Sequence, residues 1–259
     1  MGIAGRGLVV IPTYNEAASI VAVVRGALDA GDAYDVLVVD DASPDGTGAL
    51  ADDLATDSAR VHVLHRPAKD GLGAAYRAGL GWGLDRGFEA LAEMDADGSH
   101  DPADLPSLFH ALGGADLVIG SRYVPGGHVV AWPWHRRVLS EGGNRYVHAL
   151  TGLHVRDATS GFRAFRRPVL SAIGLAVIES DGYAFQLETA LRAWRAGFRL
   201  VEIPITFTER REGTSKLSRT VVAEAVWRVT RWGLAGPRGP TQVHPASVAA
   251  APGAPDAPG

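Results

Sequence analysis

Short apolar runs rich in β-branched residues alternate along this chain with longer segments of helical character. We expect buried strands at LVVIP (8–12), DVLVVD (35–40), VHVLH (61–65), EALAEMD (89–95) and ADLVIG (115–120). We expect helices between them over 17–30, 46–57, 72–87 and 102–112. Two parallel strands need a long crossover, usually a helix, so this alternation predicts an α/β fold with a mostly parallel sheet flanked by helices.

The second half of the chain continues this pattern less regularly. We expect a loop over 124–134, a helix over 136–151, a strand near 162–166, a helix over 183–196 and a strand over 198–207. Asp101 and Pro102 mark the start of the helix at 102–112, as N-cap and first helical residue. In 236–259, 16 of the 24 residues are Pro, Gly or Ala, which predicts a disordered tail after a folded domain at 1–235.

Composition and missing motifs exclude several classes of protein. The 259 residues include no cysteine, which excludes disulfides, thiolate metal sites and cysteine nucleophiles, and we expect a cytoplasmic location. No run approaches the roughly 18 to 20 apolar residues of a membrane span, and the N-terminus lacks a signal-peptide pattern. The chain has neither a GxxxxGK[ST] phosphate loop nor a GxSxG elbow, and the Gly71-Leu72-Gly73 pattern lacks the third glycine of a dinucleotide fold.

Charge is segregated along the chain. Residues 1–120 hold seven basic and nineteen acidic side chains, whereas residues 121–167 hold eight basic and two acidic ones. This pattern is typical of a protein whose first part binds a cation and whose later part binds an anion, although solvated surface would give the same counts. Nucleic acid is a poor partner for the chain because the acidic first part would repel it.

The sharpest chemical feature is the pair Asp95 and Asp97, which directly follows a predicted buried strand. Ligands of open parallel sheets bind beyond the carboxyl ends of the strands. Two carboxylates one residue apart at such an end can converge on a hard divalent cation. The alternative is a turn with helix-capping aspartates. We expect His62, His65 and His100 to be surface or turn residues rather than metal ligands.

The basic stretch offers a counterpart for an anion. Arg122 follows the predicted strand at 115–120, and a predicted helix then carries Arg136, Arg137, Ser140, Asn144 and Arg145. Their spacing of one to four residues places several of them on one face. Arginine forks beside a hydroxyl suit a phosphate. An exposed arginine-rich helix remains the alternative, since 23 of the 25 basic residues are arginine.

Six motifs, in order, extend the pattern over nearly the whole chain outside the tail: PTYNE, VVDDASPDGT, DADGSH, GSRYV, DATSGFRAFRR and EGTSKL. Together they resemble the family-2 glycosyltransferases of the dolichol-phosphate (polyprenol-phosphate) mannose synthase type. The resemblance implies a GT-A fold and transfer of mannose from GDP-mannose to a polyprenyl monophosphate, with inversion at the anomeric carbon. It also implies peripheral contact with the inner face of the cell membrane. It leaves room for a separate membrane-anchoring protein, although no residue points to one.

The same resemblance assigns roles to individual residues. The donor nucleotide would be held by Pro12, Tyr14, Glu16, Val39 and Asp41. The metal, Mg²⁺ or Mn²⁺, and the donor diphosphate would be held by Asp95, Ala96 and Asp97, with Ser99 at a position where family members often carry glutamine. The acceptor phosphate would be held by Arg122, Arg136 and Ser140, and a mobile clamp on the donor side would use Arg210 and Lys216. Asp95, Asp97 and Arg122 would be the catalytic residues.

An anionic acceptor needs no general base, so we expect none. Asp157 would then orient sugar hydroxyls or the Thr159-Ser160-Gly161 turn, and Glu188 would be an inward helix residue. Residues 217–235 form an amphipathic helix on a helical wheel, which either packs on the catalytic domain or lies at a membrane surface. Two rival functions remain open: a relative that uses UDP-glucose or another UDP-sugar, and a non-catalytic subunit that only binds a sugar nucleotide.

Overall fold

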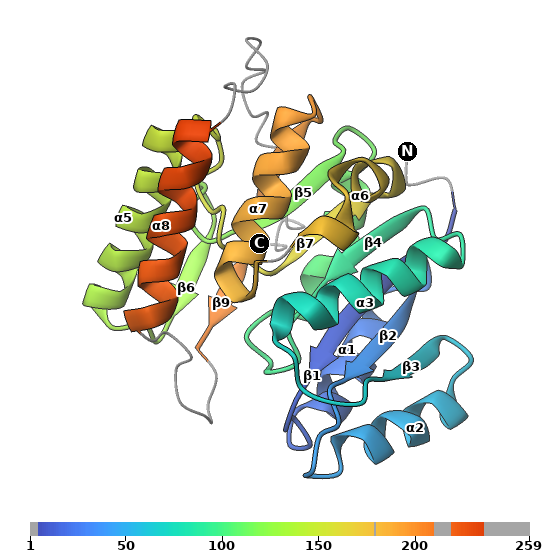
Figure 1. Ribbon diagram of the computed structural model, residues 1–259. Coiled ribbons are helices and arrows are strands. Elements are labelled where there is room, and N and C mark those ends of the chain that lie inside the picture. Colours follow the sequence, from blue (N-terminus) through green and yellow to red (C-terminus); the bar gives the residue numbers. More distant parts are fainter. Residues whose placement is uncertain (1–4, 179, 210–218, 236–259) are drawn as a thin grey trace, which may run out of the picture.

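A mostly parallel sheet forms the centre of the molecule (Figure 1). The computed structural model describes residues 5–178, 180–209 and 219–235. Within these residues the central sheet has seven strands in the order β3-β2-β1-β4-β7-β5-β8. Only β7 runs antiparallel to its neighbours, so the predicted α/β fold is confirmed. The strands are β1 (Gly7–Thr13), β2 (Tyr34–Asp40), β3 (Val61–His65), β4 (Ala90–Glu93), β5 (Leu117–Ser121), β7 (Arg163–Arg166) and β8 (Leu200–Pro204).

Helices cover both faces of this sheet. One face carries α1 (Ile20–Ala30), α2 (Thr47–Asp57) and α4 (Leu105–Ala111). The other carries α3 (Leu72–Asp85), α6 (Arg167–Ile173) and α7 (Gly182–Arg195). Beyond α7, the helices α5 (Trp134–Thr151) and α8 (Arg219–Ala235) lie side by side (Figure 1). Short 3-10 turns occupy Pro102–Asp104 and Leu175–Val177.

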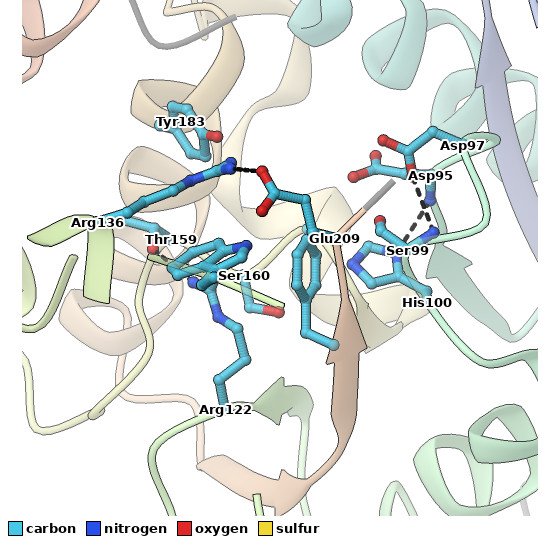
Figure 2. Close-up of a pocket in the computed structure, with 13 residues that line it drawn as sticks. Asp95, Asp97, Ser99, His100, Arg122, Arg136, Thr159, Ser160, Tyr183 and Glu209 are labelled. Atoms are coloured by element: carbon cyan, nitrogen blue, oxygen red, sulfur yellow. Dashed lines mark hydrogen bonds and ion pairs between the residues drawn. The ribbon is translucent and has the colours of Figure 1, made fainter. Parts of the chain in front are cut away.

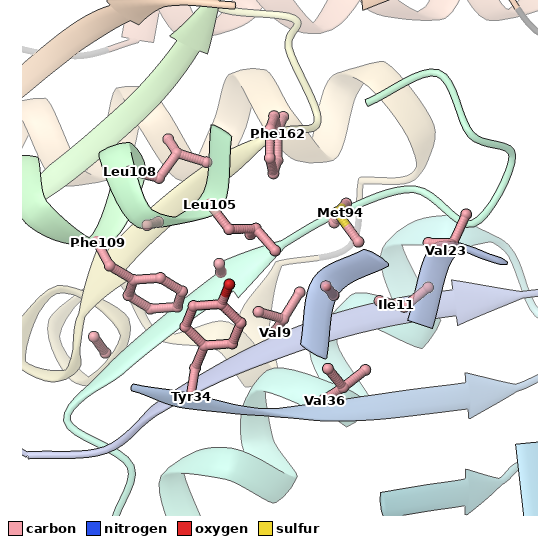
Figure 3. Packing of buried hydrophobic residues seen from close by; sticks show 14 of the residues in the cluster. Val9, Ile11, Val23, Tyr34, Val36, Met94, Leu105, Leu108, Phe109 and Phe162 are labelled. Carbon is pink, nitrogen blue, oxygen red and sulfur yellow. The ribbon is translucent and has the colours of Figure 1, made fainter. Parts of the chain in front are cut away.

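The core explains why β1 and β2 are central strands. All seven residues of each are buried, as expected for strands with helices on both sides. Figure 3 shows one of the two apolar clusters, in which the Tyr34 and Phe109 rings stack with centroids 4.9 Å apart. On the opposite face α3 approaches the sheet closely at Gly79, where a Cβ atom would lie only 2.4 Å from Val10 Cγ1. Gly79 therefore sets the separation between α3 and the sheet.

A second, two-stranded sheet corrects two predictions. The predicted loop at 124–134 contains β6 (His128–Val130), which pairs in parallel with β9 (Thr206–Thr208). The predicted single strand at 198–207 is therefore divided into β8 and β9. Ile205 is the junction, because its N–H donates to Ser121 and its carbonyl accepts from His128. β6 and β9 have only three residues each and are far apart in the chain, so neither strand gives a periodic pattern that the local sequence would reveal.

Several element boundaries also differ from the sequence prediction. The helix expected from residue 17 begins at Ile20, and α6 was not predicted. The Asp101 cap is confirmed, since its side chain accepts a 2.9 Å hydrogen bond from the Ala103 N–H, although the first turn after it is 3-10 rather than α. No helix among the described residues is long and apolar enough to cross a membrane. The predicted tail, 236–259, lies outside the described residues.

Candidate active site

The parallel strands bring the predicted acidic and basic residues to one edge of the sheet. A cavity of about 100 Å³ opens there, beyond the carboxyl ends of β4 and β5. Asp95 and Asp97 line one side of the cavity, and Arg122 and Arg136 line the other (Figure 2). The structure therefore joins the residues expected to bind a metal with two of those expected to bind a phosphate.

Two buried neutral side chains fix the Asp95 loop. The Tyr76 hydroxyl donates a 2.9 Å hydrogen bond to Asp95 Oδ1, and burial raises the pKa of Tyr76 well above its ordinary value. The Asp95 N–H donates to Nδ1 of His100 at 3.2 Å. Burial lowers the pKa of His100, which keeps its ring neutral and able to accept this bond.

The placement of His100 corrects the expectation of a surface or turn residue. Its ring is 3% exposed and stacks on Phe162, with centroids 4.8 Å apart. The edge of Phe207 closes the other side. This burial depends on Phe162, just before β7, and on Phe207 in β9, so the local sequence around His100 gave no sign of it.

The donor set beside Asp95 fits a hard divalent cation. Asp97 Oδ1 accepts a 3.0 Å hydrogen bond from the Ser99 N–H, which turns the chain back toward the cavity. Ser99 Oγ is buried, lines the cavity and has no hydrogen-bond partner among the described residues. Two carboxylates and one hydroxyl leave coordination positions for water and phosphate oxygens, as Mg²⁺ and Mn²⁺ prefer. The described residues hold no cluster of three His, Cys, Asp or Glu side chains that would complete a site without such oxygens.

Arg122 is held by a buried bidentate ion pair. Its Nε and Nη2 donate to the two carboxylate oxygens of Asp157 at 2.7 and 2.6 Å, and Asp157 is fully buried. Burial by itself lowers the pKa of Arg122, but the Asp157 charge outweighs it and the pKa is raised. Nη2 also donates to Thr159, whereas Nη1 makes no hydrogen bond to the described residues. The guanidinium is therefore charged and held in one orientation, and its Nη1 can donate to a ligand.

Aromatic rings position the two arginines relative to each other. The Trp132 ring centroid lies 4.4 Å from Arg136 Cζ and 5.2 Å from Arg122 Cζ. Phe207 meets the Trp132 ring edge to face at 5.5 Å. The Arg136 guanidinium also forms an ion pair with Glu209. Trp132, Phe207 and Glu209 were not predicted as site residues because they come from the second sheet and its flanks.

Arg163 supports the site from within the core, and the sequence analysis did not single it out. It is completely buried in β7, and its guanidinium donates to the carbonyls of Ala158, Ser160 and Gln186. These bonds hold the turn that carries Asp157, so Arg163 fixes the partner of Arg122. The carboxylate of Asp157 is engaged mainly by Arg122, but its Oδ1 also accepts a 3.3 Å hydrogen bond from the Thr159 hydroxyl of this turn. That Asp157 orients the turn stays a prediction.

The residues predicted to hold the donor nucleotide lie at the same sheet edge but outside this cavity. Asp41 Oδ1 accepts a 2.6 Å hydrogen bond from Arg66, and the Lys69 ammonium lies 3.8 Å above the Tyr14 ring. The Glu16 N–H donates to Thr47. Pro12 and Val39 pair across β1 and β2, and Val39 is fully buried with its side chain against α3. Ala96 is likewise buried in the core.

An apolar groove of about 460 Å³ adjoins the cavity. It runs between α5, α7 and α8 and shares Arg122, Arg136 and Trp132 with the cavity. Ser140 lines the groove, together with the apolar residues Val138, Leu139, Val147, Leu187, Ala225, Val226 and Val229. The two arginines therefore stand where a polar cavity meets an apolar groove.

Three residues named in the sequence analysis have not yet been located. Arg210 and Lys216 lie outside the described residues. Glu188 is 6% exposed on α7 and accepts hydrogen bonds from Ser180 and Arg192. This is the inward helix position that was expected of it.

Comparison with known proteins identifies the family. Residues 8–174 match the family described as glycosyl transferase family 2. The chain belongs to this family. It is 55% identical over 230 residues to an undecaprenyl-phosphate mannosyltransferase of Micrococcus luteus, covering 89% of this chain and 95% of the relative. It is 54% identical over 233 residues to a polyprenol monophosphomannose synthase of Mycolicibacterium smegmatis, covering 89% and 88%.

Solved structures of other glycosyltransferases share the fold. A mannosyltransferase from Pyrobaculum calidifontis, in complex with GDP-Man and Mn²⁺, superposes with a TM-score of 0.56 at 17% identity, covering 90% of this chain and 71% of that one. Glucosyl-3-phosphoglycerate synthase from Mycobacterium tuberculosis, in complex with Mn²⁺ and UDP-glucose, gives a TM-score of 0.60 at 19% identity, covering 87% and 77%. The GT-A architecture expected for this family 2 glycosyltransferase is therefore confirmed.

Proposed function

We propose that this chain transfers mannose from GDP-mannose to a polyprenyl monophosphate, with inversion at the anomeric carbon. The observation that carries the proposal is the position of Arg122 and Arg136 between the cavity with the Asp95/Asp97 pair and an apolar groove. Such a junction suits an acceptor whose phosphate is anionic and whose chain is apolar. The two relatives that are more than 50% identical to this chain are named for the transfer of mannose and for a polyprenyl phosphate acceptor. Their names support the proposed sugar and the proposed class of acceptor.

Asp95, Asp97 and the Ser99 hydroxyl would hold the divalent metal ion, Mg²⁺ or Mn²⁺. When bound, such an ion supplies the charge that stabilises a departing diphosphate. The residues of the chain contribute orientation: Tyr76 and His100 fix the Asp95 loop, so its carboxylate is in place before the donor arrives. A site organised in advance in this way needs little rearrangement at the moment of reaction.

In the proposed reaction a phosphate oxygen of the acceptor attacks the anomeric carbon of the sugar. The bond from that carbon to the donor diphosphate breaks, a new carbon–oxygen bond to the lipid phosphate forms, and GDP leaves. A phosphate monoester is already ionised at neutral pH, so its oxygen needs no general base. Asp157 is unsuited to that role because both of its oxygens are bound to Arg122. Arg122 and Arg136 would orient the attacking phosphate.

We also propose that exposed apolar side chains of α5 and α8 contact the membrane surface. One face of α8 packs on the domain, where the Tyr146 and Thr230 hydroxyls bond at 2.7 Å and Arg195 donates to the Trp232 carbonyl. Other large apolar side chains on the two helices stay exposed, with Trp134 76% and Trp227 58% accessible. Exposed tryptophans beside arginines are typical of proteins that bind at the lipid interface. Co-sedimentation with vesicles tests this contact, because replacing both tryptophans by serine should release the protein into the supernatant.

The test of the function is an incubation of the protein with polyprenyl phosphate, Mg²⁺ or Mn²⁺, and one of three donors. GDP-mannose should give a lipid-linked sugar, whereas UDP-glucose and UDP-N-acetylglucosamine should not. If UDP-glucose were the only donor to give a lipid-linked sugar, the donor would be UDP-glucose and not GDP-mannose. Absence of lipid-linked sugar from every donor would overturn the enzymatic proposal and favour a subunit that only binds a sugar nucleotide.

A further inference from the structure

Glu209 lies inside the cavity but has no place in the function described so far. It directly follows β9, and its N–H donates a 3.2 Å hydrogen bond to the Val130 carbonyl at the end of β6. Its side chain lines the cavity together with Asp95 and Arg122, and its carboxylate forms an ion pair with Arg136 (Figure 2). The main chain is thus anchored to the second sheet while the carboxylate meets the arginine.

Glu209 is the carboxylate that neutralises Arg136 within the described residues. The Arg136 guanidinium otherwise contacts the Trp132 ring at 4.4 Å, and its Nε is buried without a hydrogen-bond partner among these residues. Carboxylates and phosphates use the same donors of a guanidinium, with two parallel hydrogen bonds from its fork. Nη1 of Arg136 donates to Glu209 Oε1, so the carboxylate occupies one of the guanidinium donors that a phosphate would use.

We propose that Glu209 is an internal competitor for the acceptor phosphate and thereby a specificity residue for it. This inference rests on the proposed function, in which Arg136 binds that phosphate. The acceptor must displace the carboxylate from Arg136, and a ligand achieves this only if it brings a comparable or larger negative charge. A phosphate monoester carries about −1.5 to −2 charges at neutral pH, whereas an alcohol or a water molecule carries none. Glu209 therefore selects for a phosphorylated acceptor.

The surroundings of Glu209 favour the exchange. The cavity already contains the carboxylates of Asp95 and Asp97, which repel the carboxylate of Glu209. A divalent cation held by Asp95 and Asp97, as proposed above, would offset their repulsion of an incoming phosphate. Side-chain exposure of 21% for Arg136 and 30% for Glu209 leaves the pair partly solvated, so its strength is modest. The main-chain bond to Val130 allows the side chain to rotate away from Arg136 without movement of β9.

The experiment compares Glu209→Gln with a matched control, Glu141→Gln. Glu141 lies on α5, the helix that carries Arg136, and forms an ion pair with Arg137 at 2.8 Å. It does not line the cavity. Both variants lose one negative charge close to an arginine, so a general electrostatic effect would appear equally in both. Affinity for inorganic phosphate and for a short-chain polyprenyl phosphate is measured by calorimetry without any sugar donor, and GDP affinity is measured with Mn²⁺.

We expect Glu209→Gln to bind both phosphates roughly three- to tenfold more tightly than the unaltered protein, because a partly exposed ion pair no longer competes. Glu141→Gln should bind them with unchanged affinity, and neither variant should change GDP affinity. Equal or weaker phosphate binding by Glu209→Gln overturns the inference, as does a loss of GDP affinity, which would place Glu209 in the donor site. Because no donor is present in the phosphate measurements, these outcomes are separate from a failure of the chain to transfer sugar.

Discussion

The buried pair between Asp157 and Arg122 gives the most quantitative prediction. Asp157→Asn keeps the shape of the side chain but removes the charge that holds the arginine. Asp157 is fully buried and Arg122 is 7% exposed, so the guanidinium would remain buried without its counter-charge. Removing one partner of such a pair costs about 3–5 kcal/mol of unfolding free energy. For a domain of this size the cost corresponds to a fall in melting temperature of roughly 6–20 °C.

Thermal unfolding followed by circular dichroism measures this cost, with Asp32→Asn as the control. Asp32 also pairs with an arginine, Arg60 at 3.4 Å, but its side chain is 98% exposed, so we expect no measurable change. In transfer assays Asp157→Asn should raise the KM for the acceptor, because Arg122 loses its orientation. A variant as stable as the unaltered protein, with normal binding of donor and acceptor but no turnover, would refute this account and indicate that Asp157 is a general base.

Three further predictions concern the metal pair, the aromatic platform and a buried acid. Asp97→Asn should lower the transfer rate at least about 100-fold and weaken Mn²⁺ binding in calorimetry, since a charged ligand is lost; unchanged metal affinity would contradict the assignment. Trp132→Ala should raise the acceptor KM roughly 3- to 30-fold with donor KM unchanged, because both guanidinium groups lose their ring contact. Burial raises the pKa of Glu93 to about 7, so the folded state retains a proton that the unfolded state releases above its ordinary value of 4.5. The free energy of unfolding of the unaltered protein should therefore fall as the pH rises from about 4.5 to about 7. Glu93→Gln lacks this loss, so its free energy of unfolding, measured with urea, should rise by about 3 kcal/mol relative to that of the unaltered protein between pH 4.5 and pH 7.5.

The sequence predicted the residues that follow buried strands with a recognisable apolar run. Asp95 lies two residues after β4 and Arg122 directly follows β5. The apolar runs of both strands are visible in the sequence, and the arrangement of the sheet brings the two residues to one edge. Trp132 and Glu209 could not be predicted in this way. They flank three-residue strands that form only by pairing with each other, far apart in the chain.

Buried polar residues were the second class that the sequence did not reveal. His100 is buried because the rings of Phe162 and Phe207, both remote in sequence, enclose it. Arg163 is completely buried although it is charged, and its partners are mainly carbonyl groups of the turn before β7 and of α7. An arginine in a short strand is ordinarily exposed at the surface, so only the three-dimensional structure shows the role of Arg163.

The central claim is that sugar is transferred from a nucleotide donor to the phosphate of a lipid, and the lipid product tests it most directly. Polyprenyl phosphate is incubated with GDP-mannose and Mn²⁺, and the extracted lipid is analysed by mass spectrometry and by NMR of the anomeric carbon. The account predicts one mannose per lipid phosphate, with the anomeric configuration opposite to that of the donor. Retention of configuration, or release of free mannose and GDP with no lipid-linked sugar, would contradict it.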